Sequence, residues 1–121
     1  MIVRHLIFAA LALAGCHRSN EVSTTTTTSA AYTPTHEEAA LWLTNARCDR
    51  AAECFDVGTD YADRAECTAV VGRSTRTTLG ACRGDVNAAE LETCVARIRG
   101  EPCNHPRDTL DRIAACRRLC R

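Results

Sequence analysis

The sequence predicts an all-α protein, a small disulfide-rich array of about four short helices on a disordered N-terminal tether. Four segments each begin with a helix-capping pattern and continue with apolar residues at helical spacing. No alternating apolar run or Asn-Gly turn indicates a strand. Nine cysteines among 121 residues, of which only 4% are aromatic, indicate that cross-links hold the chain together in place of a large apolar core.

Residues 1–15 have the pattern of a removable export signal peptide. They combine a basic start, an apolar run too short to span a bilayer, and small residues before Cys16. The stretch Leu13-Ala14-Gly15-Cys16 resembles the lipobox of bacterial lipoproteins, in which the cysteine becomes acylated and forms the mature N-terminus. We therefore expect a lipid anchor at Cys16. An ordinary secretory leader with a chance cysteine is the alternative.

The expected anchor also predicts a location. Each buried methylene of a fatty chain contributes roughly 0.8 kcal/mol, so two or three chains hold a protein on a membrane without a transmembrane helix. The residue after Cys16 is His17, whereas lipoproteins of the Gram-negative inner membrane commonly carry aspartate there. By that resemblance we expect the protein in the cell envelope, anchored to the outer membrane.

Residues 16–35 comprise the acylated cysteine and a flexible linker. The unbroken run Thr24–Thr28 and its polar surroundings bury almost nothing, and so cannot offset an ordering cost of about 1 to 2 kcal/mol per residue. At about 5 to 6 Å × √n, such a linker spans roughly 25 Å. An O-glycosylated stalk is the alternative for the threonine cluster. The helical, cysteine-rich domain then occupies residues 36–121.

Capping patterns predict where the first two helices begin. Thr35 followed by Glu38 forms a capping box, and Asp63 followed by Glu66 repeats the pattern. The first helix is expected to turn inward a stripe of Leu41, Thr44, Cys48, Ala51, Ala52 and Phe55. The second is expected to turn inward Cys67, Val70, Val71 and Ser74, with Thr78 as its furthest extent.

The last two helices follow the same logic. Asn87 followed by Glu90 opens the third, which ends at Gly100. Its inward residues are predicted to be Leu91, Cys94, Val95 and Ile98. Asp108 followed by Asp111 is a weaker opening for the fourth. Its apolar residues are Leu110, Ile113, Ala114 and the stretch from Cys116 to Cys120.

The cysteines beyond the anchor are even in number and dense. An exported chain meets an oxidising compartment, so disulfide bonds are expected. Zinc is the competing interpretation, but the chain has no C-x2-C pair, and among its histidines only His105 lies near cysteines. No metal and no cofactor is therefore expected. The predicted disulfide cysteines are Cys48, Cys54, Cys67, Cys82, Cys94, Cys103, Cys116 and Cys120.

The connectivity of these cysteines is mostly open, since eight of them allow 105 pairings. Two antiparallel helical hairpins place Cys48 near Cys67 and Cys94 near Cys116, at similar heights on either side of their loops. These two pairs are a hypothesis from spacing alone.

The net charge of the chain and its distribution exclude one class of partner. The 15 basic residues, all arginine, balance the 15 acidic ones, and removal of the signal peptide leaves a formal charge of 14 − 15 = −1. Nucleic-acid binders normally carry a large positive excess, so no nucleic-acid partner is expected. Residues 48–67 carry a net charge of 2 − 6 = −4 and residues 95–121 one of 7 − 3 = +4. Such asymmetry can orient a partner protein or bring the domain down on anionic headgroups, although solvated helix faces explain it too.

No catalytic group stands out. Glu37 and Glu38 point in different directions on a helix and act as first-turn charges, while His105 and Asp108 lack a nucleophile elbow and fit the start of a helix. Bridged cysteines are poor nucleophiles. Trp42, the single tryptophan, is expected in the core beside the Leu41 stripe, with anchoring of a partner as the alternative.

The cysteine framework also resembles a known family. Its residues are Ala46-Arg47-Cys48-Asp49-Arg50, Cys54, Tyr61-Ala62-Asp63, Cys67, Leu91-Glu92-Thr93-Cys94, Cys103-Asn104-His105-Pro106-Arg107-Asp108-Thr109-Leu110 and Ala115-Cys116-Arg117. Over residues 41–121 they resemble small cysteine-rich bacterial lipoproteins labelled natural product biosynthesis lipoproteins. The resemblance implies an accessory role beside biosynthetic machinery and supplies no catalytic residue.

The sequence thus predicts a lipid-anchored, disulfide-stabilised envelope protein that is not an enzyme. It acts as a binding or accessory module, with the membrane as one partner and a protein or small molecule as the other. A thiol redox or metal-binding protein is the alternative, and the two differ in whether the native protein carries free thiols of low pKa.

Overall fold

The computed structural model describes residues 31–104 and 110–120, and within these residues the all-α prediction is confirmed. The elements are α1 (His36–Glu53), α2 (Arg64–Gly80), α3 (Ala88–Arg99), the 3-10 turn η1 (Leu110–Arg112) and α4 (Ala114–Arg117). None of the helices in these residues has the length and apolar character needed to cross a membrane. The predicted signal peptide, Cys16 and most of the predicted linker lie outside the described residues, as do His105 and Asp108.

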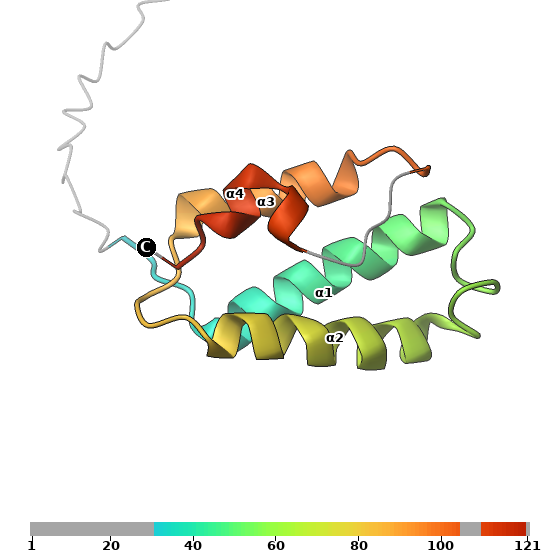
Figure 1. The fold of residues 1–121 in the computed structure, drawn as a ribbon, viewed down its shortest axis with the longest axis horizontal. Helices are drawn as coiled ribbons and strands as arrows, with labels where there is room; N and C mark the ends of the chain where they lie inside the picture. The colour runs from blue at the N-terminus through green and yellow to red at the C-terminus, as the bar shows by residue number, and fades with distance from the viewer. Residues whose placement is uncertain (1–30, 105–109, 121) are drawn as a thin grey trace, which may run out of the picture.

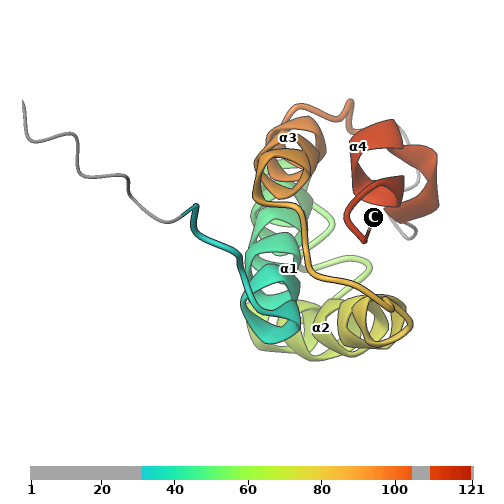
Figure 2. The same cartoon turned by 90° about the vertical axis from the view of Figure 1, so that its left-hand side faces the viewer.

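Helix α1 is the centre of the domain (Figures 1 and 2). It packs antiparallel against α2, it also contacts α3, which runs in about the same direction as α1, and α4 packs on α3. The segment before α1, the α2–α3 connection and the C-terminal end lie together at one end of the domain, and the α1–α2 loop lies at the other (Figure 1). Long-range bonds fix the first end: His36 Nε2 lies 3.0 Å from the Gly84 carbonyl, and the Asn87 amide donates to the Leu119 carbonyl at 2.9 Å.

The capping box at the start of α1 is confirmed. The Glu38 amide donates to the Thr35 hydroxyl at 3.1 Å, and the Thr35 amide donates to the Glu38 carboxylate at 2.8 Å. Hydrogen bonds from the Thr35 amide, from its hydroxyl and from the Tyr32 hydroxyl lower the pKa of Glu38. The cap therefore fixes both the start of α1 and the chain just before it.

The predicted inward stripe of α1 is only partly right. Thr44, Cys48 and Ala51 are buried, but Leu41 is 55% exposed, Phe55 is 81% exposed, and Ala52 is exposed as well. The reason is that α1 packs against two helices. It therefore buries two rows of residues, Ala39, Leu43 and Ala46 in one and Ala40, Thr44, Cys48 and Ala51 in the other.

Trp42 was expected in the core, and that prediction is wrong. Its side chain is 40% exposed, because it lies on the side of α1 that neither α2 nor α3 fully covers. It lines a shallow groove between α1 and α3 with Val95 and Ala96. The neighbouring Leu43 takes the buried position instead, with no exposed surface.

Helix α2 begins as predicted and buries a narrower row. The Asp63 carboxylate accepts from the Glu66 amide at 2.8 Å, and the Glu66 carboxylate accepts from the Ala62 amide at 2.6 Å. Val70, Ser74 and Thr78, which were expected inside or at the helix end, are exposed, because α2 packs mainly against α1 and so buries a row at i, i+4 spacing. That row is Cys67, Val71, Thr75 and Leu79, and the helix runs on to Gly80.

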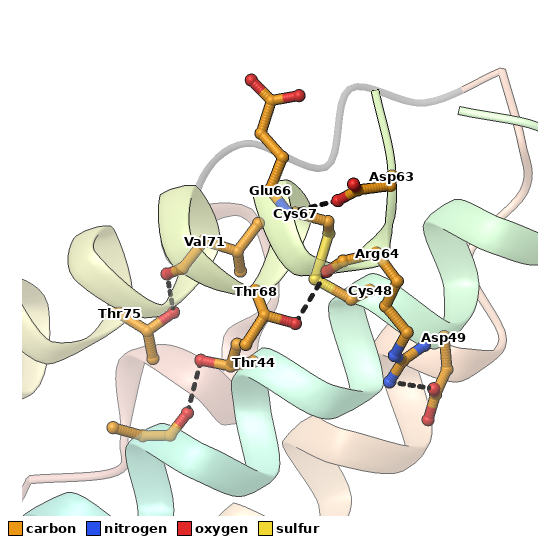
Figure 3. The surroundings of a disulfide bond; sticks show 11 residues. Thr44, Cys48, Asp49, Asp63, Arg64, Glu66, Cys67, Thr68, Val71 and Thr75 are labelled. Carbon is orange, nitrogen blue, oxygen red and sulfur yellow. Dashed lines mark hydrogen bonds and ion pairs between the residues drawn. A yellow bond between two sulfur atoms is a disulfide. The ribbon is translucent and has the colours of Figure 1, made fainter. Parts of the chain in front are cut away.

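The buried hydroxyls between α1 and α2 are satisfied inside their own helices (Figure 3). Thr44 donates to the Ala40 carbonyl at 2.7 Å, and Thr75 donates to the Val71 carbonyl at 2.8 Å. Buried polar groups that keep a partner avoid the desolvation penalty of a lost bond. Their methyl groups remain free to pack, and a Cβ added at Gly72 would meet the Thr44 methyl at 3.5 Å.

Helix α3 agrees with the prediction and the fourth helix does not. The Asn87 side chain caps α3 by accepting from the Glu90 amide at 3.0 Å, Leu91, Cys94 and Ile98 are buried, and Val95 is half-buried. Asp108 lies outside the described residues; from Leu110 on, the chain forms the short turn η1 and the four-residue α4 in place of one continuous helix, and the N-cap Ile113 of α4 makes no capping side-chain bond. Ala114, one of the apolar residues assigned to the expected fourth helix, is exposed. An N-cap without a side-chain acceptor leaves one amide of the first turn without that partner, which makes so short a helix less stable by about 1 kcal/mol.

All eight cysteines of the domain are paired. Cys48–Cys67 and Cys94–Cys116 confirm the pairs inferred from spacing, with Cα–Cα distances of 5.9 and 4.9 Å. The remaining bridges are Cys54–Cys103 and Cys82–Cys120, with Cα–Cα distances of 5.3 and 5.4 Å. The fully buried large side chains among the described residues are aliphatic, threonine or cysteine, and none is aromatic. The bridges therefore form a substantial part of a small core.

Candidate functional site

The loop between α1 and α2, residues 54–63, presents the most exposed aromatic side chain of the described residues. Phe55 has 81% of its surface open to solvent. It comes directly after Cys54, the C-cap of α1. The loop lies at the end of the α1–α2 hairpin, away from the segment that enters α1 (Figure 1).

Phe55 occupies a backbone conformation that usually belongs to glycine. Its φ is +62°. The Asp56 amide donates to the Ala51 carbonyl at 2.8 Å, and the Phe55 amide donates to the Ala52 carbonyl at 3.2 Å. These two bonds define a Schellman motif, in which the residue at this position is left-handed and most often glycine. A non-glycine residue held there costs about 1 to 3 kcal/mol, a strain that clusters at functional sites.

The rest of the loop is rigidly bonded to itself. The Asp56 carbonyl accepts from the Asp60 amide at 2.8 Å and from the Tyr61 amide at 3.1 Å. The Gly58 amide donates to the Tyr61 carbonyl at 2.6 Å, and Gly58, with φ of +98°, supplies a turn that a residue with a side chain would strain. Val57 and Tyr61 pack on the small cluster around the Cys48–Cys67 bridge. Phe55 thus projects from a fixed base.

Two disulfides hold this base. Cys54, the residue before Phe55, is bonded to Cys103 beyond α3, and the Arg50 guanidinium donates to the Glu101 carbonyl at 2.7 Å nearby. The fully buried Cys48–Cys67 bridge links the last turns of α1 to the first turn of α2 (Figure 3). The loop is therefore fastened to α1, to α2 and to the segment that follows α3.

The surroundings of the loop are acidic. The two arginines of residues 48–67 are already engaged by acids of the same segment. Arg64 pairs with Asp49 at 2.6 Å (Figure 3), and Arg50 pairs with Glu53 at 2.6 Å. The net charge of −4 for residues 48–67 already counts these two arginines, and Asp63 and Glu66 accept hydrogen bonds at the start of α2. An exposed aromatic ring on a segment of net negative charge suits a cationic, partly apolar ligand.

A second open surface runs along the side of α1. We call Leu41, Trp42 and the two grooves beside them the α1 outer face. The groove toward α2 is lined by Leu41, Ala65 and Ala69 among others, and the groove toward α3 by Trp42, Val95 and Ala96. Charged side chains at its margins are Glu37, Glu38, Arg64, Arg76, Glu92 and Arg99. It is an apolar strip with both signs of charge along its edges.

The other predicted positions have structural roles. Glu38 caps α1, and Glu37 lies 3.7 Å from Arg76 in an exposed pair. Across residues 31–104 and 110–120, no group of three or more His, Cys, Asp or Glu residues is placed to hold a metal ion. Arg118 pairs with Glu90 through two bonds of 2.8 and 3.0 Å, which raise its pKa and tie α4 to α3.

Phe55, the most exposed aromatic residue of the candidate site, was expected inside the domain, and that prediction is wrong. One feature of the sequence could have indicated its exposure. The first helix has to end before the turn at Gly58, but no glycine follows Cys54 to end it. A chain that ends a helix without glycine either avoids the left-handed conformation or accepts its strain.

The fold and its sulfur bridges define a small disulfide-stabilised all-α domain. Residues 48–121 match the profile of a family described as a family of unknown function, DUF6184. Since the match covers more than half of the chain, the protein belongs to this family. The matched region contains all eight bridged cysteines. No curated protein and no solved structure matched the chain in the corresponding searches.

Proposed function

We propose that this protein is a lipid-anchored binding module of the cell envelope that presents Phe55 to a cationic partner and catalyses no reaction. The signal-peptide pattern and Cys16 support the anchor. The rigid α1–α2 loop supports the binding role. The resemblance to natural product biosynthesis lipoproteins extends the proposal to an accessory role beside biosynthetic machinery, at the outer membrane.

The observation that carries the binding role is the strained, exposed Phe55. A buried aromatic residue would repay its strain by packing, but Phe55 is 81% exposed and gains little from its own domain. Aromatic residues dominate binding hot spots, and a side chain held in place before binding loses less entropy on association. The simplest physical reason to keep Phe55 there is a contact with another molecule.

The charge around the loop indicates the partner's chemistry. Residues 48–67 carry a net charge of −4, which speeds the encounter with a cationic surface and weakens as salt rises. A basic protein segment with an apolar residue for Phe55, or a cationic amphiphilic metabolite, fits this description. Binding is expected to fall with ionic strength.

The thiol redox alternative requires a cysteine that can become a thiolate. All eight cysteines of the described residues are in disulfides, and Cys48, Cys67 and Cys94 have no exposed surface. A titration of free thiols in the natively purified protein separates the alternatives, because the binding module carries none in residues 31–121 and a redox protein carries a reactive pair.

Phe55→Gly tests the binding role with two opposite effects. Relief of about 1 to 3 kcal/mol of strain exceeds the about 0.5 to 1 kcal/mol of entropy that glycine loses on folding, so unfolding in urea should cost about 1 kcal/mol more. Partner binding should fall, because the anchor is gone. Val70→Ala is the control, because it removes another exposed apolar side chain. It should change neither the free energy of unfolding nor partner binding.

The partner itself can be trapped in cells. A photo-crosslinking phenylalanine analogue at position 55 should yield one adduct that disappears as salt increases, and the same analogue at position 70 should not. A Phe55→Gly variant that is less stable than the wild type, or a position 55 that traps nothing beyond the position 70 background, would contradict the proposal.

A further inference from the structure

We propose that the α1 outer face rests on the headgroup region of a zwitterionic phospholipid bilayer. This inference rests on the proposed lipid anchor and adds an orientation to it. The face exposes Leu41 and Trp42 at 55% and 40% of their surfaces, with alanines of α2 and α3 on either side. Nothing in the described residues covers it.

The path of the chain brings this face toward the anchor. In Figure 2 residues 31–35 leave α1 on the side opposite α4, which is the open side of the helix. The Tyr32 hydroxyl bonds to Glu38, one turn before Leu41 and Trp42, so the last described part of the tether is fastened beside the face. A predicted linker of roughly 25 Å from Cys16 is short enough to keep the face close to the bilayer.

The side chains of the face match the chemistry of a membrane interface. Tryptophan and tyrosine concentrate at the level of the headgroups, where an apolar ring and a polar N–H or O–H are both satisfied. Tyr32 and Trp42 supply these two side chains, and Tyr32 is 55% exposed. Leu41 and the alanines beside it supply the apolar surface between them.

The charges at the edges favour a zwitterionic lipid over a strongly anionic one. Arg76 and Arg99 can reach phosphates, while Glu37 and Glu92 can meet the ammonium groups of phosphatidylethanolamine. Arg64 is paired with Asp49, and the Glu38 carboxylate is held in the α1 cap. With the Arg64–Asp49 pair neutral, the remaining charges along the edges sum to 2 − 3 = −1, so the face has no net attraction to anionic lipid.

A face of this size can keep the domain on a membrane only if the domain is also tethered there. One leucine and one tryptophan cannot retain a free protein on a bilayer, but a tether converts docking into an intramolecular step at an effective concentration that reaches the millimolar range for short linkers. Docking therefore depends on acylation of Cys16, and the unanchored domain is expected to stay in solution.

Trp42 reports on the docking directly because it is the only tryptophan in the chain. The mature protein is purified from membranes, and the mass of its N-terminal peptide shows how many acyl chains it carries. The protein is then reconstituted into phosphatidylethanolamine–phosphatidylcholine vesicles with brominated acyl chains. We expect the Trp42 emission to shift to shorter wavelength and to be quenched by the brominated lipid. Leu41→Glu should abolish both effects. Val70→Glu, at a site on α2 that is 45% exposed and lines neither groove, should keep them.

Each failure has a distinct meaning. A chain without acyl groups overturns the anchor and the docking with it. An acylated chain whose Trp42 is not quenched overturns the docking and leaves the anchor intact. Quenching that persists in Leu41→Glu shows contact through another surface, and overturns the proposal as well. Trp42 that is shielded from acrylamide in native membranes but open in lipid vesicles assigns the face to a protein partner instead.

Discussion

Replacing Cys54 and Cys103 by alanine is expected to lower the free energy of unfolding by about 4 kcal/mol, because in the chain-entropy model the bridge restricts a long loop of the unfolded chain. The two cysteines lie 49 residues apart, the largest separation of the four bridges. Cys54 is half-buried and Cys103 is exposed, so the substitutions leave little cavity. Urea unfolding followed by circular dichroism measures the loss.

The Cys48→Ala, Cys67→Ala variant is the matched comparison. Its bridge closes only 19 residues, for which the same model gives about 3 kcal/mol. Both side chains are fully buried, so a cavity term adds to the entropic one. A loss below about 1 kcal/mol for the Cys54–Cys103 variant would show that this bridge does not stabilise the fold through the unfolded chain.

Leu43→Ala is expected to destabilise the domain by about 2 to 5 kcal/mol, the range for a large buried aliphatic side chain. Leu43 has no exposed surface and packs in the main core with Leu91 and Ile98. Leu41, two residues earlier on the same helix, is 55% exposed. Leu41→Ala should therefore stay within about 0.5 kcal/mol of the wild type.

This pair of variants tests the orientation of α1. The sequence stripe placed Leu41 inside, and the structure places Leu43 there. Equal losses from the two substitutions, or a larger loss from Leu41→Ala, would mean that α1 is rotated from the orientation described above. Chemical denaturation of both variants at the same pH gives the comparison.

The starts of the first three helices could be predicted because caps are local. Thr35, Asp63 and Asn87 each accept a hydrogen bond from an amide three residues later, and those bonds depend on neighbouring residues only. The buried face of a helix depends on how many partners it has. Helix α1 packs against α2 and α3 and buries two rows of residues, and the helices that would pack against it could not be inferred from its own residues.

The bridges and the α1–α2 loop also divide into features set by neighbouring residues and features set by the packing of the whole domain. Cys48–Cys67 and Cys94–Cys116 join neighbouring helices, so spacing alone indicated them. Cys54–Cys103 and Cys82–Cys120 join segments 49 and 38 residues apart, and their pairing follows from the packing of the whole domain. Phe55 was misplaced because its left-handed conformation is imposed by the end of α1 and by the bridge at Cys54, not by its own preference.

The central claim is that sulfur bridges stabilise this small, aromatic-poor domain in place of a larger apolar core. Far-UV circular dichroism during stepwise reduction tests it most directly, with the number of free thiols counted at each step. The account predicts no free thiols in residues 31–121 at the start and a cooperative loss of helix as the bridges open. A fully reduced domain that keeps its helices and its thermal transition would contradict it.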